Sequence, residues 1–510
     1  MTGARGARRV RTALVAAGLL LGLAACDEPR RPNILWVVWD TARADHLGLY
    51  GYARDTTPEL DRWAAGARVF ENCLSTAGYT LPSHASLFTG LLPSEHCADN
   101  DHTRLDDRYT TIAELLRSAG YRNYLYSANP HVSSAGNFDQ GFDLAEHPWS
   151  PRFSQRAALI VRGKLLERDS TSELARAFER AERNEGRLSA WNIKAAGELA
   201  QQALLDWLDA SDRRRPFFAF VNYMEAHRPL VPPRRYRERM MAAADVERSY
   251  EVDRSWLPTW EYTFGLREFD DRQIELTRAT YDAALAELDD LFARLIQALQ
   301  ARGHLDDTIV VLTSDHGEHL GEQHMLDHQY SLYQPLLRVP LIVHYPARFP
   351  AGRDSRPVMH FDIFPTLLEL AGVAPPVGLR SRAESLLEPP RPRTRLAEDP
   401  ASSKVAVAMV RQSHPGWDPS AWQRRLRALF EGQHKLIWGS DGRHELYDLA
   451  ADPSESSDLF GGHRELAARL QQVLDSYVES LQPCERAGTP APELTPQEIE
   501  RLQALGYLGG

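Results

Sequence analysis

Residues 33–39 read NILWVVW and are followed directly by Asp40. The run has the length of a strand and carries apolar side chains at every position from Ile34 to Trp39. A strand that is apolar on both faces is typical of a parallel sheet covered by helices on both sides. We therefore expect this segment to be a central strand of an α/β fold, with Asp40 at its carboxyl end.

Further apolar runs of strand length follow along the chain, at 121–126, 216–223, 308–314 and 339–344. Segments with helical patterns lie between them, at 110–119, 195–210 and 277–302. Strands that alternate with helices predict a doubly wound, mostly parallel sheet flanked by helices. In such a sheet, ligands bind beyond the carboxyl ends of the strands.

The chain divides into one large domain and a smaller appended unit. We expect the large domain at 32–387, with polar insertions at 150–200 and 228–275 over the sheet edge or the rim of the site. A Pro- and Arg-rich linker at 388–396 leads to a C-terminal α+β subdomain at 397–482. In this subdomain we predict antiparallel strands at 404–411, 425–432, 434–438 and 443–449 and an amphipathic helix at 463–481. The tail, 483–510, is Pro-rich and ends in a short helical motif.

The overall composition excludes some classes of function. With 510 residues and 43% hydrophobic content, the chain is long and apolar enough for a large folded core. Its formal net charge of −11 argues against a nucleic-acid-binding protein, which needs a basic face.

The first residues predict export. Arginines precede a short apolar stretch and small residues, and Cys26 follows them. Leu23-Ala24-Ala25-Cys26 resembles the bacterial lipoprotein lipobox, which implies a signal peptide at 1–25 and acylation of Cys26. We therefore expect a lipoprotein anchored to a bacterial envelope membrane through Cys26, on its periplasmic or cell-surface face. The alternative is an ordinary cleaved signal peptide.

The remaining cysteines are Cys73, Cys97 and Cys484. Outside the cytoplasm, Cys73 and Cys97 could form a disulfide and leave Cys484 free. Buried or unpaired thiols are the alternative, and the sequence does not decide between them.

Several chemically active side chains lie at the predicted strand ends. Asp40 ends the first strand, Asp315 and His316 end a later one, and Thr80 begins the segment TLPSHASLFTG. Two carboxylates, an imidazole and a hydroxyl can bind one divalent cation, which would activate Thr80 as a nucleophile. Taken singly, each of these residues has a structural alternative as a turn former or helix cap.

The order of these motifs is more specific than any one of them. PNILWVVWDTARADHLGLYGY, TTPELDRWA, the TLPSHASLFTG segment, TSDHGEHLGE and LLRVPLIVHYP together resemble the sulfatase family of the alkaline phosphatase superfamily. The resemblance runs from about 32 to 372, and ELYDLAADPSESSDL at 445–459 resembles the family's C-terminal subdomain. It implies one metal ion beside the nucleophile, with Asp40, Asp315 and His316 at ligand positions.

The resemblance also implies residues that contact the substrate. His227 matches a family histidine that contacts the ester group. Asn129 and His131 fall near a Lys/His pair of the family, and His328 falls near another of its lysines. We therefore expect His227 to be catalytic, and Asn129, His131 and His328 to bind substrate.

The chain departs from the family pattern at its nucleophile. Sulfatases oxidise a Cys or Ser to formylglycine within C/S-x-P-x-R, but Thr80 and His84 stand at the first and last of these positions. A threonine alcohol would yield a ketone and not the aldehyde, so no formylglycine is expected. We predict that Thr80 itself is the nucleophile, with His84 as a further catalytic residue, and that phosphate, phosphonate or phosphodiester substrates are favoured over sulfate.

The ligand set also differs. Thr41 replaces a second aspartate ligand, and His316 stands where sulfatases usually have Asn. These changes favour Mn²⁺ or Zn²⁺, with Ca²⁺ and Mg²⁺ as alternatives. Further imidazoles near the expected site, from His84, His319, His324 and His328, are candidates for general acid–base work or for ordinary loop hydrogen bonds.

Three functions follow as hypotheses. The first is a hydrolase or transferase acting on a phosphoryl ester, and the second is a sulfuric ester hydrolase without formylglycine. The third is a non-catalytic, envelope-anchored binder of anionic glycans or lipids. The substrate, whether a glycan, a lipid head group or a small-molecule ester, is not specified by any sequence pattern.

Overall fold

The computed structural model describes residues 31–166, 193–400, 403–484 and some residues of the tail, namely 494–496, 498, 499 and 502. The predicted signal peptide at 1–25 and the predicted lipidation site Cys26 lie outside the described residues, as does most of the tail. No helix in the described ranges is long and apolar enough to cross a membrane.

An eight-stranded, mostly parallel sheet forms the centre of the large domain, in the order β10-β2-β9-β6-β1-β5-β3-β4. The first predicted strand is β1 (Asn33–Trp39), which lies between β5 (Phe217–Tyr223) and β6 (Thr308–Thr313) and is parallel to both. β3 (Arg122–Ser127) and β4 (Leu144–Glu146) extend the parallel part. The prediction of a doubly wound, mostly parallel sheet is confirmed.

The other edge of the sheet is mixed. β9 (Arg338–His344) is antiparallel to β6 and to β2 (Arg68–Leu74), and β10 (Gly352–Met359) pairs parallel with β2. The sequence did not predict β2, β4 or β10. β10 lies at the edge of the sheet, where several polar side chains remain exposed, so it lacks the continuous apolar run of a central strand.

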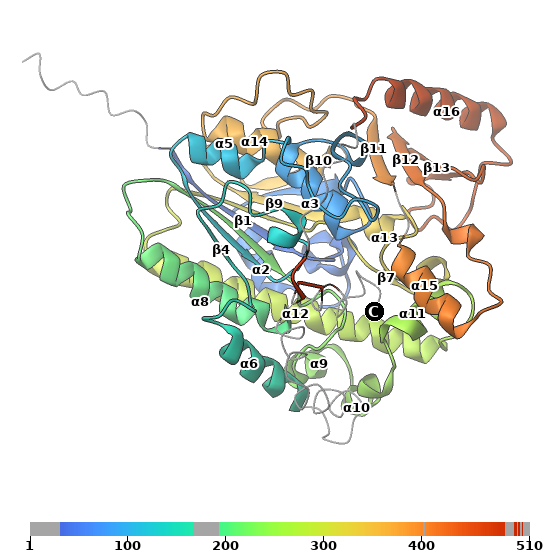
Figure 1. Cartoon of the computed structure of the whole chain (residues 1–510), viewed down its shortest axis with the longest axis horizontal. Helices are drawn as coiled ribbons and strands as arrows, with labels where there is room; N and C mark the ends of the chain where they lie inside the picture. Colours follow the sequence, from blue (N-terminus) through green and yellow to red (C-terminus); the bar gives the residue numbers. More distant parts are fainter. Residues whose placement is uncertain are drawn as a thin grey trace, which may run out of the picture.

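Helices cover both faces of the sheet (Figure 1). α2 (Pro58–Ala64), α8 (Ala196–Asp209) and α12 (Asp271–Ala301) pack on the face that contains Leu35, Val37 and Trp39. The opposite face, with Ile34, Trp36 and Val38, contacts three further helices, α3 (Thr80–Thr89), α5 (Ile112–Ser118) and α14 (Ile363–Leu370). Because the side chains of a strand alternate between faces, the apolar run of β1 contributes to both halves of the core.

The long helix α12 begins six residues before its predicted start. The Asp270 side chain accepts a hydrogen bond from the backbone N–H of Gln273 at 2.7 Å, and Gln273 completes a capping box. The polar segment 228–275, predicted as an insertion, forms α9 (Arg234–Met240), α10 (Ala243–Glu251) and α11 (Trp256–Thr263). α9 and α10 pack on α12 and not on the sheet, as expected of an insertion.

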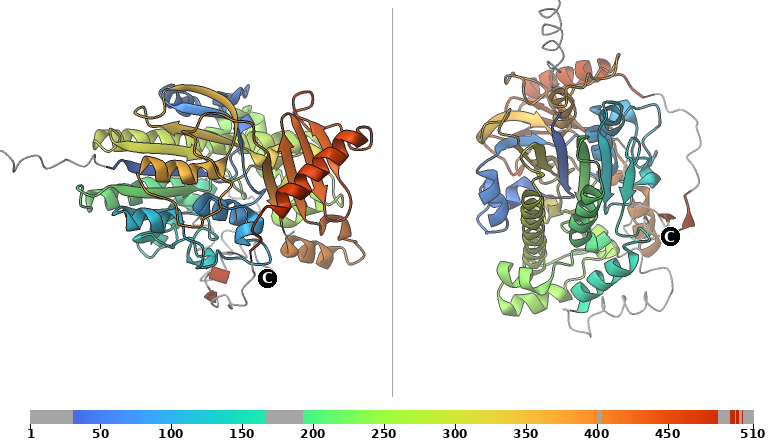
Figure 2. Two further views of the ribbon diagram at one scale, coloured as in Figure 1. Left: turned by 90° about the horizontal axis from the view of Figure 1, so that it is seen from above. Right: turned by 90° about the vertical axis from the view of Figure 1, so that its left-hand side faces the viewer.

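The C-terminal subdomain is an antiparallel sheet at one end of the large domain (Figure 2). Its strands are β11 (Arg395–Asp399), β12 (Leu426–Glu431), β13 (His434–Gly439) and β14 (Glu445–Asp448), and α16 (Arg464–Glu479) packs on them. β11 begins inside the stretch that the sequence predicted as a linker. The prediction of an α+β subdomain with antiparallel strands is confirmed.

The predicted strand at 404–411 is wrong, because this segment is the helix α15 (Lys404–Ser413). Its Ala406, Val407 and Val410 are buried on one side, which is a helical spacing. The Ser403 side chain caps the first turn by accepting a hydrogen bond from the N–H of Ala406. Alternating valines in KVAVAMV imitate the two-residue period of a strand.

A disulfide joins Cys97 to Cys484, with a Cα–Cα distance of 6.0 Å. The possible Cys73–Cys97 disulfide is therefore contradicted. Cys73 lies on β2 with its side chain in the apolar core, whereas Cys97 follows the short helix α4 (Pro93–His96) at the boundary with the subdomain. The bond ties the segment after α16 to the large domain.

Candidate active site

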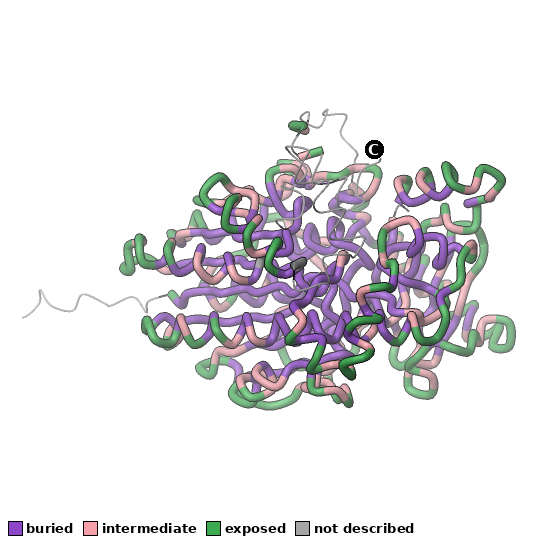
Figure 3. Tube along the Cα trace, turned by 90° about the horizontal axis from the view of Figure 1, so that it is seen from below, coloured by how far each residue is buried: buried purple, intermediate pink, exposed green. Residues whose placement is uncertain are grey.

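Asp40, Thr80, Asp315 and His316 converge at the carboxyl ends of β1 and β6. Asp40 follows β1, Asp315 and His316 follow β6, and Thr80 is the first residue of α3. One ligand atom each of Asp40, Asp315 and His316 lies within 4.8 Å of the others, and Thr80 Oγ1 is 3.3 Å from His316 Nε2. All four residues are buried. Figure 3 shows that the interior of the large domain consists mostly of buried chain, with exposed segments at its surface.

Each carboxylate is anchored through one oxygen only. Asp40 Oδ2 accepts hydrogen bonds from Asn129 Nδ2 at 2.8 Å and from Asn222 Nδ2 at 3.4 Å. Asp315 Oδ1 accepts from the backbone N–H groups of Thr41 and His316, at 3.2 and 2.9 Å. The other oxygens, Asp40 Oδ1 and Asp315 Oδ2, are buried and accept no hydrogen bond from any described residue.

The His316 ring is oriented by its own backbone. Its Nδ1–H donates to the Gly317 carbonyl at 2.8 Å, so the lone pair of Nε2 points toward Thr80. Metal-binding histidines are usually held in this way, through the ring nitrogen that does not bind the metal. Two carboxylate oxygens, one imidazole nitrogen and one hydroxyl therefore face the same small volume.

The electrostatics of these residues fit a bound cation. Burial and the neighbouring Asp315 carboxylate raise the pKa of Asp40 well above its usual range, and burial also raises the pKa of Asp315. Within the described ranges, neither carboxylate forms an ion pair with a lysine or arginine. A buried carboxylate oxygen without a hydrogen bond or counter-ion is costly, and a divalent cation would remove that cost at both oxygens. The donor set therefore fits one divalent cation, held by Asp40, Asp315, His316 and Thr80.

Thr41 does not join this set. Its side-chain hydroxyl donates to the carbonyl of Asp40 at 2.7 Å, and its backbone has a φ of 62°. This left-handed conformation turns the chain sharply after β1 and brings the Thr41 N–H to Asp315. The residue thus supports a ligand instead of being one.

Asn129, expected to bind substrate, lies against the predicted ligands. Besides the bond to Asp40, its Nδ2 is 3.4 Å from Thr80 Oγ1, and its Oδ1 accepts from the backbone N–H of His131 at 3.0 Å. His131 is 7% exposed, and burial lowers the pKa of its imidazole to about 3. The structure brings both residues to the site, with Asn129 as a bridge between Asp40 and Thr80.

His84 lies one helical turn after Thr80. Its Nδ1–H donates to the Thr80 carbonyl at 3.1 Å and is 3.4 Å from Asp315 Oδ2, while its ring contacts those of Phe138 and Phe220. Burial lowers the pKa of His84, so the neutral imidazole is favoured. These contacts place the His84 ring beside Asp315 Oδ2, one of the two carboxylate oxygens that accept no hydrogen bond from a described residue.

His328 and His227 lie on the other side of His316. The His328 ring is 4.7 Å from the His316 ring and 5.0 Å from the His227 ring. Although burial opposes it, the carboxylates of Asp327 and Glu318 raise the pKa of His328 to about 10. Asp327 in turn forms an ion pair with Arg228, whose guanidinium lies over the Trp256 ring at 4.1 Å.

Two other histidines are placed elsewhere. His319 hydrogen-bonds through Nε2 to the Ser331 hydroxyl at 2.7 Å, and His324 is exposed and stacks on Tyr262 at 4.1 Å. These contacts agree with the alternative that they are hydrogen-bonded or packed loop residues.

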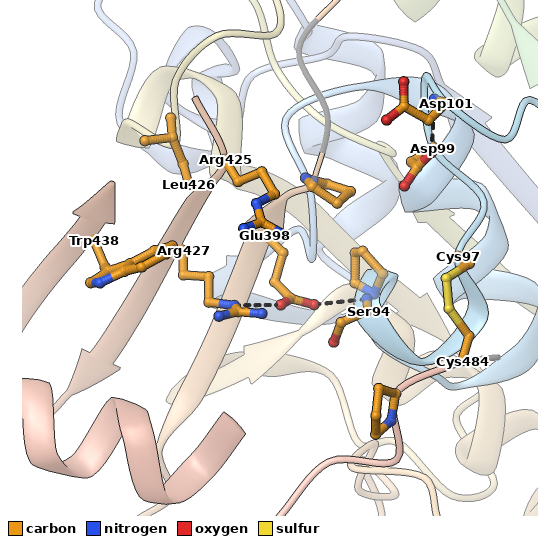
Figure 4. A pocket seen from close by; sticks show the side chains of 13 residues that line it. Ser94, Cys97, Asp99, Asp101, Glu398, Arg425, Leu426, Arg427, Trp438 and Cys484 are labelled. Carbon is orange, nitrogen blue, oxygen red and sulfur yellow. Dashed lines mark hydrogen bonds and ion pairs between the residues drawn. A yellow bond between two sulfur atoms is a disulfide. The ribbon is translucent and has the colours of Figure 1, made fainter. Parts of the chain in front are cut away.

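A separate cavity is not lined by any of these residues (Figure 4). It has a volume of about 420 Å³ and lies between α4, β11, β12 and the segment around Cys484. Arg427 Nε donates to Glu398 at 3.0 Å across it, and the Ser94 N–H donates to the same carboxylate at 2.9 Å. None of its lining residues belongs to the groups of described residues that could hold a metal ion.

Sequence reasoning missed several residues that shape the site. Asn222 is the second-to-last residue of β5 and contacts Asp40, and its position near the end of a strand beside β1 was the available indication. The hydroxyls of Ser75 and Ser83 donate to the Asp315 carbonyl, at 2.5 and 2.7 Å. Glu318 lies inside the recognised TSDHGEHLGE motif, but nothing in the sequence pairs it with His328.

Family models match nearly the whole described chain. A model described as "Sulfatase" matches residues 32–373, and one described as "N-sulphoglucosamine sulphohydrolase, C-terminal" matches residues 321–482. Among curated relatives, an N-acetylglucosamine-6-O-sulfatase of Bacteroides thetaiotaomicron is 24% identical and covers 90% of each chain. Arylsulfatase K of Gallus gallus is 26% identical over 90% of this chain and 86% of its own length.

Solved structures have the same fold. The phosphonate monoester hydrolase of Agrobacterium radiobacter superposes with a TM-score of 0.67 at 21% identity, covering 88% of this chain and 96% of its own. A protein solved in complex with its substrate D-glucosamine-2-N,6-O-disulfate superposes with a TM-score of 0.64 at 21% identity, covering 90% and 100% of the two chains.

Proposed function

This chain belongs to the sulfatase family, and on that premise we propose that it is a metal-dependent hydrolase of phosphate-type esters with Thr80 as nucleophile. One observation carries the proposal: Thr80 Oγ1 lies 3.3 Å from His316 Nε2, beside the two buried carboxylate oxygens that accept no hydrogen bond. The hydroxyl is thus placed where a cation would bind, at the start of α3.

Asp40, Asp315, His316 and Thr80 would hold the metal ion. When bound, a divalent cation would lower the pKa of the Thr80 hydroxyl and stabilise negative charge on the ester oxygens. An imidazole in place of one oxygen ligand favours Mn²⁺ or Zn²⁺ over Ca²⁺ or Mg²⁺.

The reaction proceeds in two steps at phosphorus. Thr80 Oγ1 forms a bond to phosphorus as the ester P–O bond breaks, and the alcohol leaves with the proton that Thr80 gives up. Water then adds to phosphorus, the bond to Oγ1 breaks, and the threonine hydroxyl is restored as the phosphate leaves. We assign contact with the ester oxygens to His328, whose ring lies next to that of His316, and to His227, whose ring lies next to that of His328.

The side chains around Thr80 favour phosphorus over sulfur. A sulfated threonine has no aldehyde hydrate through which to eliminate sulfate, whereas a phosphothreonine is open to attack by water. In addition, Asn129 and His84 stand at or near positions where the family has a lysine and an arginine. A site with fewer permanent cations suits a singly charged phosphodiester or phosphonate monoester. In addition, two similarly folded structures are phosphonate monoester hydrolases.

Sulfate-ester hydrolysis is the second candidate. The curated relatives include sulfatases acting on sugars, and the similarly folded glucosamine-disulfate complex holds a sulfated amino sugar. The substrate that we propose is an anion. It is an anionic glycan, a lipid head group or a small-molecule ester.

The proposed location is outside the cytoplasm, at a bacterial envelope membrane, with the lipid anchor on Cys26. The Cys97–Cys484 disulfide supports this proposal, because structural disulfides persist in oxidising compartments.

The test compares matched aryl esters with defined metals. Purified protein is assayed on an aryl phosphate, a phosphodiester, a phosphonate monoester and a sulfate, with Mn²⁺, Zn²⁺, Ca²⁺ and Mg²⁺ in turn. We expect turnover of a phosphorus ester, its loss in Thr80→Ala, and a phosphorylated Thr80 peptide in acid-quenched samples. Full activity of Thr80→Ala would exclude the covalent role, and a clear preference for sulfate would favour the second candidate. Stoichiometric metal without turnover of any ester would favour a non-catalytic binder.

A further inference from the structure

We propose that Lys194 is a positioning residue that fixes the turn carrying His227. The inference rests on the proposed function, because it takes His227 to contact the ester. It concerns a buried lysine in the region 150–200, which the sequence placed at the periphery.

The turn in question connects β5 to α9. β5 ends at Tyr223, and His227 and Arg228 follow four and five residues later, both buried. Lys194 lies just before α8 and is 1% exposed. Its Nζ donates hydrogen bonds to the carbonyl oxygens of Met224 and His227. One amino group therefore links the two ends of the turn.

Hydrogen bonds and an ion pair from neighbouring groups fix the positions of Lys194 and of the turn. Lys164 on α6 (Ser154–Leu166) donates to the Lys194 carbonyl at 2.8 Å and forms an ion pair with Glu287 of α12. Within the turn, Glu225 accepts hydrogen bonds from the N–H of Gly197, at 2.9 Å, and from that of Met224, at 3.2 Å. The turn is thus fastened to the start of α8 by a backbone-to-carboxylate bond and by Lys194.

The position of the His227 ring depends on this backbone. Its Nδ1–H donates to the carbonyl of the next residue, Arg228, so the ring moves with the local backbone. Its ring lies 5.0 Å from the His328 ring, which in turn lies 4.7 Å from the ring of the proposed ligand His316. Without Lys194, two buried carbonyl groups lose an N–H donor and the turn loses one of its two attachments to the start of α8, so its His227 end can shift.

A shift of this kind is costly for catalysis even when the fold survives. A misplacement of about 1 Å in a reacting or orienting group can lower a rate about 10²-fold. A buried lysine also costs more to fold than an apolar side chain of similar size, so packing alone does not explain its presence. Fixing His227 is a role that methionine, which has no N–H donor, cannot fill.

Lys194→Met removes the donors and keeps most of the side-chain length. Lys435→Met is the matched control, because Lys435 is also fully buried and donates to a carbonyl, that of Leu332, and to Glu455 within the subdomain contact. Both variants should lose stability. We expect kcat/KM of Lys194→Met to fall about 100-fold, mostly in kcat, whereas that of Lys435→Met stays within about threefold of wild type.

A double-mutant cycle separates positioning from general damage. If Lys194 acts through His227, then Lys194→Met added to His227→Ala lowers kcat/KM little further than His227→Ala alone. Metal content should equal that of wild type in every variant. Independent, additive losses in the cycle would overturn the proposal.

A measurement that does not depend on turnover separates this test from the test of the proposed function. In protein labelled with ¹³C-histidine, the His227 ring signal is identified by its loss in His227→Ala. We expect it to move in Lys194→Met and to stay in place in Lys435→Met; an unmoved signal in Lys194→Met contradicts the proposal even if no ester is turned over. Should Lys194→Met fail to fold, Lys194→Gln, which keeps two N–H donors on a shorter chain, takes its place in both measurements.

Discussion

Asn129 offers the sharpest test of how the metal site is built. Its Nδ2 donates to Asp40 Oδ2 at 2.8 Å, and this bond lowers the pKa of a carboxyl group that burial and Asp315 raise. In Asn129→Ala the Asp40 carboxyl loses that donor, so protonation competes better with the metal ion. We expect weaker metal binding, and a larger loss at lower pH, because Asp40 must be ionised to be a ligand.

The geometry sets the size of the effect. A hydrogen bond to a buried charged group contributes about 1.5–3 kcal/mol, and about 1.4 kcal/mol corresponds to a tenfold change in an equilibrium constant. The metal dissociation constant should therefore rise about 10- to 150-fold in Asn129→Ala. Asn222→Ala is the matched control, since its bond to the same oxygen is longer, 3.4 Å, and a rise of about threefold or less is expected.

The assay is a competition titration of metal against a chelating dye, at two pH values, with thermal unfolding of the metal-free proteins as a check on folding. Kinetics at saturating metal then give KM for the ester. If Asn129→Ala binds metal as tightly as wild type and only KM rises, Asn129 is a substrate ligand, as the sequence suggested, and the argument from the Asp40 contact is refuted.

Further predictions concern the stability of the chain. Cys97→Ser should lower the free energy of unfolding by about 2–5 kcal/mol, and reductant should lower that of wild type equally; a denaturant titration that reductant leaves unchanged would contradict the disulfide. Burial lowers the pKa of Lys194 to about 7, so above this pH the folded chain has released a proton that the unfolded lysine keeps. The free energy of unfolding of wild type should therefore rise relative to that of Lys194→Met between pH 6.5 and pH 9. If the difference between their urea midpoints does not change with pH, the amine keeps its ordinary pKa. Added metal at about 100 times its dissociation constant should stabilise wild type by about 2.7 kcal/mol, and Asp315→Asn should lose that increment in thermal unfolding.

The sequence predicted the central elements because burial on both sides leaves a local trace. β1 was predicted at the residues where it is found, since every position from Ile34 to Trp39 is enclosed by the two helix layers. β10 was missed because an edge strand has no such continuous run, and α15 was misassigned because a short apolar segment fits two periods. Asp40, Asp315 and His316 lie at the carboxyl ends of predicted strands, and this position predicted where the site lies.

Tertiary structure alone decided which distant residues support that site. Cys97 pairs with Cys484, 387 positions away, and Lys194 reaches the carbonyl of His227 across the start of α8. Burial and periodicity act on neighbours along the chain, so they shape the local pattern of residue types. A contact between distant segments depends on how whole helices and strands pack. A cysteine or lysine can form such a contact while the residue types next to it in the sequence stay the same. The sequence therefore determined the central strands of the sheet and the residues at their carboxyl ends, while the folded chain determined the edge strands, the hydrogen-bond partners of the site and the disulfide.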